Sequence, residues 1–218
     1  LTIIGDGLMT YSPMRVRMPH TVTARIGRVV HADVVPGLTP LVGAPTATPV
    51  PVSPDLFRAV LAETAVAVDD TAELDSALDG ESTVLVLGQY LSALGLVSEG
   101  EEIALQKEMI DRAASRRPQH IVFKPHPAAP PRLSDALRDR ARVHGIDFRE
   151  YRGALAAEML AERIDATAVI AGFSTALPTV QALFGREIDA VGADTVLARL
   201  TPYLSLIHIS EPTRQAEI

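Results

Sequence analysis

The sequence predicts an α/β protein built on a parallel sheet. From Thr83 onward, short apolar runs alternate with amphipathic segments of helix length. Short apolar strands separated by amphipathic helices are typical of βαβ units. We therefore expect a Rossmann-like domain over residues 81–203.

The elements of this domain follow in chain order. Apolar runs predict strands at 83–87, 120–123, 168–171 and near 188–191. Helical periodicity predicts helices at about 101–115, 134–144, 155–163 and 176–184. In the first of these helices, Ile103, Met109 and Ile110 are expected to face the sheet. Its charged residues are expected to face water: Glu101, Glu102, Lys107, Asp111 and Arg112.

The preceding part of the chain has a different character. Residues 1–50 read as the end of an earlier domain followed by a Pro/Gly/Thr-rich connector. Residues 51–80 are predicted to be an interdomain helical region, in which Ser53 caps a helix and Pro54 takes its first position. The apolar residues spaced for one face of that helix are Leu56, Val60 and Leu61. The basic residues Arg15, Arg17 and His20 are either a solvated segment or contacts to an anionic acceptor.

Composition narrows the class of protein. The chain is 47% hydrophobic and 22% charged, with no apolar run near the ~18 residues that a membrane span requires. It has no cysteine, which excludes disulfides and thiolate chemistry. Its net charge of −7 argues against nucleic acid as a partner. Asp69 and Asp70 form an acidic pair without a companion ligand, so a turn is favoured and no metal is predicted.

Both ends of the sequence look cut. Leu1 is not an initiating Met and begins inside an apparent strand, so we expect a large N-terminal part to be missing. Residues Leu204 to Arg214 match, over eleven positions, the in-frame translation of a transposon-end sequencing adapter. Residues 204–218 are therefore expected to be adapter read-through in a metagenomic fragment, and they are excluded from fold reasoning.

A histidine between prolines follows one apolar strand. The segment Phe123-Lys124-Pro125-His126-Pro127 places His126 and Lys124 at a strand's carboxyl end, where open α/β sheets bind ligands. The prolines restrict the backbone around His126. The segment is either an anion-binding element or a solvent-exposed turn whose histidine has no function.

Two further segments also follow apolar strands. Gly172-Phe173-Ser174-Thr175 offers backbone amides and two hydroxyls at a helix start, suited to phosphate binding or to simple N-capping. Ile3-Ile4-Gly5-Asp6-Gly7 ends in a carboxylate between glycines. Asp6 is therefore either a general base or a turn former.

In this order, Asp6-Gly7, His126-Pro127 and Ser174-Thr175 resemble motifs of the bacterial sialyltransferases, most closely the α-2,8-polysialyltransferase-like family. The resemblance runs from Leu1 to about Tyr203. It implies a two-domain GT-B glycosyltransferase of cell-surface polysaccharide biosynthesis. Such an enzyme transfers sialic acid from cytidine monophosphate (CMP)-sialic acid to a glycan acceptor hydroxyl, with inversion and without a metal or other cofactor.

The resemblance also implies roles for individual residues. Asp6 is the general base, although Gly5 stands where the family has a first acid. His126-Pro127 binds the CMP phosphate and assists its departure, and Ser174 with Thr175 holds the same phosphate. The positive charge of Lys124 is expected to assist His126.

Two more donor-binding segments come from the same resemblance. Gly88 and Gln89 lie in a loop similar to the family's first loop of the nucleotide domain. Glu158 matches a Glu that holds the ribose hydroxyls, although Ala156 replaces the proline of that element. The expected location is the cytoplasm, with the inner face of the bacterial membrane as an alternative reached through the missing portion.

Two other functions remain open from the sequence. A cytidine-diphosphate-glycerol-type polymer transferase also uses a Lys/Arg-x-His-Pro segment, but it tends to carry a Ser-Asp pair that is missing from 172–175. A non-catalytic nucleotide-sugar-binding protein is the second alternative, because Gly5 replaces an acid.

Overall fold

The computed structural model describes residues 1–5, 11, 18–41, 47–68, 74, 78, 80–172 and 174–199. Several residues singled out from the sequence lie outside this part of the chain: Asp6, Gly7, Arg15, Arg17, Asp69, Asp70, Phe173 and the segment 204–218. The chain divides into two compact units, one holding Leu1–Val60 and the other Leu61–Arg199. Each unit is described by itself.

The first unit contains a three-stranded parallel sheet in the order β1-β2-β3. Its strands are β1 (Thr2–Ile4), β2 (Arg28–Ala32) and β3 (Thr48–Val52), and a short helix α1 spans His20–Thr23. The N–H of Thr48 donates to the carbonyl of Gly27 at 2.9 Å, so Thr48 points toward β2. Pro49 and Pro51 occupy the alternating positions, whose backbone nitrogens face away from β2. Strand β3 lies at the end of the Pro/Gly/Thr-rich stretch in which the sequence indicated an irregular connector.

Helix α2 (Pro54–Val66) begins as its sequence predicts. The N–H of Leu56 donates to the hydroxyl of Ser53 at 3.3 Å, which confirms the cap. The predicted apolar face is buried only in part. Leu61 packs against the core of the second unit, whereas Leu56 and Val60 are 57% and 49% exposed.

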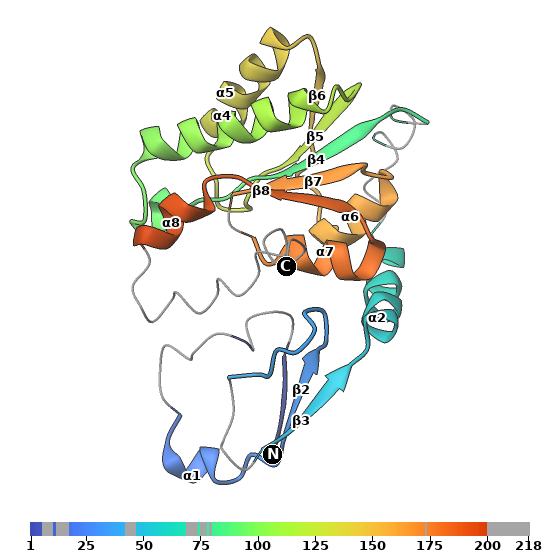
Figure 1. Ribbon diagram of the computed structural model, residues 1–218, viewed down its shortest axis with the longest axis vertical. Coiled ribbons are helices and arrows are strands. Elements are labelled where there is room, and N and C mark those ends of the chain that lie inside the picture. The colour runs from blue at the N-terminus through green and yellow to red at the C-terminus, as the bar shows by residue number, and fades with distance from the viewer. Residues whose placement is uncertain are drawn as a thin grey trace. The chain divides into compact units, whose positions relative to one another are not determined.

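The second unit is built on five parallel strands in the order β6-β5-β4-β7-β8 (Figure 1). These strands are β4 (Thr83–Leu87), β5 (His120–Lys124), β6 (Asp147–Glu150), β7 (Ala168–Ala171) and β8 (Glu187–Ala190). Strand β4 is buried along its whole length and lies at the centre. This arrangement confirms the predicted α/β class with a parallel sheet.

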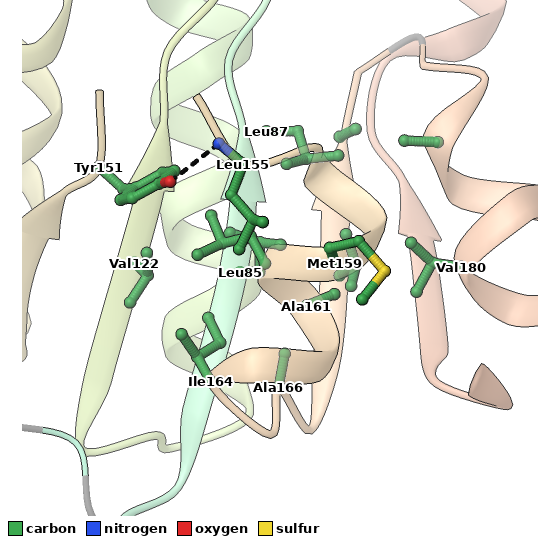
Figure 2. Close-up of a cluster of buried hydrophobic side chains, with 14 of the residues drawn as sticks. Leu85, Leu87, Val122, Tyr151, Leu155, Met159, Ala161, Ile164, Ala166 and Val180 are labelled. Carbon is green, nitrogen blue, oxygen red and sulfur yellow. Dashed lines mark hydrogen bonds between the residues drawn. The ribbon is translucent and has the colours of Figure 1, made fainter. Parts of the chain in front are cut away.

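Helices cover both faces of this sheet (Figure 1). Val84 and Val86 of β4 point to one face, where they meet α4 (Glu99–Ser115) and α5 (Pro131–Val143). Leu85 and Leu87 point to the opposite face, which α6 (Ala157–Arg163) and α7 (Ala176–Phe184) cover. Figure 2 shows the second of these cores, in which Leu155 and Met159 pack beside Leu85. A short 3₁₀ helix η2 (Ser92–Leu94) follows β4, and α8 (Ala193–Arg199) follows β8.

Three features differ from the sequence expectation. Strand β6 and helix α8 were not predicted. Strand β6 is the charged segment Asp-Phe-Arg-Glu, and among the described strands it pairs with β5 alone. Glu102 was expected to face water but is fully buried on α4.

Among the described helices, none combines the length and apolarity needed to cross a bilayer.

Candidate functional site at the carboxyl edge of the sheet

The register of the sheet brings the predicted segments to one edge. Leu87, the last residue of β4, lies beside Lys124 of β5 on one side and Ala171 of β7 on the other. Because parallel strands end at the same edge, the loops that follow all leave the sheet together. Eight residues of the predicted site come from these loops or the elements beside them: Gly88, Gln89, Lys124, His126, Pro127, Glu158, Ser174 and Thr175.

His126 is exposed and is held by its own turn. Its Nδ1 accepts a hydrogen bond from the N–H of Ala128 at 3.2 Å, and its carbonyl accepts from the N–H of Ala129 at 2.8 Å. The preceding residue, Pro125, is buried. With Nδ1 as an acceptor, the neutral imidazole carries its proton on Nε2. The ring is therefore set to act as an Nε2–H donor.

Lys124 is directed toward the loop that follows β6. Its Nζ donates to the carbonyl of Gly153 at 3.1 Å and lies 4.8 Å from the centroid of the Tyr151 ring. The hydroxyl of Tyr151 in turn accepts from the N–H of Leu155 at 3.0 Å (Figure 2). Lys124 thus carries a positive charge at the sheet edge and also ties this loop to β5.

Glu158 lies in the first turn of α6, after that loop. Burial raises the pKa of its carboxyl, while the hydrogen bond from its own backbone amide and the charge of Lys124 act in the opposite direction. The net effect is a raised pKa, which the positive charge of Lys124 moderates.

The two hydroxyls before α7 have different surroundings. The Ser174 hydroxyl accepts a hydrogen bond from the N–H of Ala176 at 3.2 Å. It thereby satisfies one of the free amides at the start of α7, as an N-cap side chain does. Thr175 is exposed, and its side chain makes no capping hydrogen bond. The structure thus supports the capping alternative for Ser174 more directly than for Thr175, and it leaves phosphate binding by the pair as a prediction.

The loop after β4 is closely packed. A Cβ added to Gly88 would lie 2.6 Å from Cζ of Phe123 and 3.1 Å from Cα of Pro125, so a side chain there would have to displace the Phe123 ring. Gln89 is buried, and its backbone carbonyl accepts from Nε2 of Gln106 at 3.0 Å. Among the described residues, the side-chain Oε1 of Gln89 has no hydrogen-bond partner. That oxygen lies 3.1 Å from where a Cβ on Gly172 would be, which places Gln89 between the ends of β4 and β7.

Sequence reasoning missed Glu102 at this edge. Its carboxylate accepts hydrogen bonds from the backbone of the loop after β4. The signal was present in the helical periodicity, because Glu102 shares the spacing of the buried residues Gln106, Met109 and Ala113. Glutamate's usual preference for water outweighed that spacing in the prediction.

The described residues contain no group of three or more His, Asp or Glu side chains arranged to hold a metal ion. The acid expected to act as base, Asp6, lies outside the part of the chain that the structure describes. The described residues of the candidate site are therefore those at the carboxyl edge of the five-stranded sheet.

The fold is that of an α/β protein with a parallel sheet, and its candidate ligand site lies at the carboxyl ends of the strands. The family model for alpha-2,8-polysialyltransferase (POLYST) matches residues 1–188 of the chain. The chain belongs to this family, which confirms the resemblance seen in the sequence. Membership indicates a sialyltransferase that uses a nucleotide-sugar donor, CMP-sialic acid, and a glycan acceptor. No curated protein matches the chain.

Proposed function

We propose that this protein is an inverting, metal-independent sialyltransferase of GT-B architecture, with the second unit as its donor-binding domain. The observation that carries the proposal is the placement of His126, Lys124, Glu158 and Thr175 at or after the carboxyl ends of β5, β6 and β7. Hydrogen-bond donors and positive charge there suit a nucleotide phosphate, and Glu158 supplies an acceptor for hydroxyl groups.

The reaction breaks the bond between the anomeric carbon and the phosphate oxygen of the donor. The electron pair leaves with CMP, so negative charge grows on the phosphate. The acceptor oxygen bonds to the opposite face of the anomeric carbon, and its proton passes to Asp6. His126 donates through Nε2 to the departing phosphate, and Thr175 adds a hydroxyl donor. In a dry, preorganised site each such donor contributes about 3 kcal/mol.

Glu158 accepts hydrogen bonds from the ribose hydroxyls in its ionised form. Burial favours the neutral acid, and Lys124 opposes that effect by stabilising the carboxylate. Lys124 therefore serves the site through its charge and through its hold on the carbonyl of Gly153. Because protein donors carry the phosphate, the proposed mechanism includes no step at a metal ion.

The test is transfer from CMP-sialic acid to an oligosialic acid acceptor, with and without a chelator. We expect CMP release and a lengthened acceptor at equal rates in both conditions. Nuclear magnetic resonance (NMR) of the product should show the anomeric configuration opposite to that of the donor. Loss of activity in chelator would overturn metal independence, and retained configuration would overturn inversion.

The same assay separates the alternatives. CDP-glycerol offered in place of CMP-sialic acid should give no product. Turnover of CDP-glycerol alone would favour a polymer transferase of that type. CMP binding without turnover of either donor would favour a non-catalytic nucleotide-sugar-binding protein.

A further inference from the structure

The carboxylate of Glu102 is fully buried beneath the loop that follows β4. It accepts hydrogen bonds from the N–H of Leu91 at 2.8 Å, the N–H of Ser92 at 3.0 Å and the hydroxyl of Ser92 at 2.5 Å. Nε2 of Gln106, one helical turn further along α4, donates to it at 3.3 Å. Both carboxylate oxygens of Glu102 thus accept hydrogen bonds, from the loop after β4 and from Gln106.

Such a group is costly to bury unless it is well paired. An ionised carboxylate with several N–H and O–H donors forms charge-assisted bonds, which are stronger than neutral ones. Gln106 also donates to the carbonyl of Gln89, so two side chains of α4 hold three backbone groups of the loop. Two side chains of α4 therefore anchor the loop.

The loop after β4 lies between the two segments that are proposed to bind the phosphate. Strand β4 lies between β5, which precedes His126, and β7, which precedes Thr175. A ligand held by both of those residues must pass over the end of β4. The N–H of Gly88 donates to the carbonyl of Lys124 at 2.8 Å, and those of Leu91 and Ser92 donate to Glu102. These three amides are committed within the protein and are not donors to a phosphate.

We infer that Glu102 is a positioning residue that shapes the loop after β4 as a surface for the nucleoside part of the donor. This inference rests on the proposed function. In this inference His126 and the residues before α7 bind the phosphate. The loop after β4 contacts the nucleoside through its shape and donates no hydrogen bond to the phosphate. Weakening the hold of Glu102 should then reduce affinity for the nucleoside whether or not a phosphate is attached.

The experiment measures binding of CMP and of cytidine to the full chain and to Glu102→Gln. In this variant an NH₂ group faces the loop amides in place of an acceptor oxygen. We expect the Kd values of both ligands to rise by a similar factor, about tenfold, as for loss of charge-assisted hydrogen bonds. His126→Ala should instead weaken CMP and leave cytidine unchanged. Glu108→Gln, the same change at an exposed position of α4, should leave both Kd values unchanged.

Hydrogen exchange supplies a readout that is independent of any ligand. The amides of Leu91 and Ser92 should exchange faster in Glu102→Gln, while the amides of β4 stay protected. Ser92→Ala removes one donor and leaves the carboxylate paired with two amides, so it provides a milder variant if Glu102→Gln does not fold. It should shift exchange and both Kd values in the same direction by a few-fold.

The outcomes separate the two proposals. Loss of CMP affinity with unchanged cytidine affinity would overturn the role assigned to the loop. Unchanged Kd values and unchanged exchange in both variants would overturn the role of Glu102, and the proposed function would stand. If the parent chain binds neither CMP nor cytidine, the proposed function fails, and faster exchange would still show that Glu102 holds the loop.

Discussion

At the scale of single residues, the exposed ring of His126 combines a fixed backbone with a fixed tautomer. The N–H of Ala128 occupies Nδ1, so the ring presents Nε2 to the outside. The sequence predicted the rigid turn from the flanking prolines. It did not predict the tautomer, because the amide that sets it depends on the fold of the turn.

We predict that His126→Ala lowers turnover by roughly 10²-fold or more, because it removes a donor to the charge that grows on the departing phosphate. Initial rates with CMP-sialic acid would measure the effect. His144→Ala is the matched control, since His144, the residue after α5, pairs with Asp111 of α4 and has no place in the site. Turnover of His126→Ala within a few-fold of the parent would show that this histidine is not central.

We also predict that Ser174→Ala combined with Thr175→Ala weakens CMP binding while the fold stays intact. Loss of the Ser174 contact to Ala176 costs only about 1 kcal/mol of stability, as for other helix caps. Calorimetric titration with CMP and a thermal melt measure the two effects separately. Ser115→Ala, an exposed hydroxyl at the end of α4, is the control. Unchanged CMP affinity in the double variant would leave capping as the function of the pair.

At the scale of elements, strands with long apolar runs were predictable and the others were not. Strand β4 has its predicted bounds, Thr83–Leu87, because each of its residues is buried between helices and favours a continuous apolar run. Strand β6 is charged and only half-buried, and β3 contains two prolines, so neither has the local signature of a strand. Both are held by pairing with a neighbour, which a local pattern does not reveal.

The candidate site follows the same logic. Loops after apolar strands could be placed at one edge from the βαβ pattern alone. The surroundings of Glu102 could not, because its partners Leu91 and Ser92 lie ten or more residues earlier in the chain. The contact of Lys124 with the carbonyl of Gly153 likewise depends on the loop after β6, which was not predicted as following a strand.

The fit between Gly88 and Phe123 leads to a prediction for the sheet as a packed element. Gly88→Ala should destabilise the protein by about 1–3 kcal/mol, because the new methyl would overlap the Phe123 ring and the backbone of Pro125. Chemical denaturation measures the change. Gly100→Ala places the same methyl in open space on α4 and should be neutral or slightly stabilising. Equal stability of the two variants would mean that the ring of Phe123 moves aside without cost.

At the scale of the whole molecule, acid should weaken the second unit through its paired carboxylates. Hydrogen bonds from Arg140 and His144 hold the pKa of Asp111 below its ordinary value of 3.8 and thereby link α4 to α5. A lowered pKa contributes stability that is present above the ordinary pKa. That contribution is lost as pH falls through the lowered value.

We therefore predict that Asp111→Asn lowers stability at neutral pH and flattens the loss of stability below about pH 4. The effect should be small and should decrease in high salt, because the pair is half-exposed. Urea unfolding between pH 3 and pH 7 would show both changes. Asp139→Asn, at an exposed carboxylate on α5 that pairs within its own helix, is the matched control.

The alternating prolines of β3 bear on intermolecular strand pairing in concentrated solution. Among the described strands β3 forms one border of its sheet, and its outward positions, Pro49 and Pro51, have no N–H to offer. A strand from another molecule that approached this border would find carbonyl acceptors without the donors that a ladder requires. The border is thereby protected against edge-to-edge polymerisation, which is the usual route from an open sheet to fibrils.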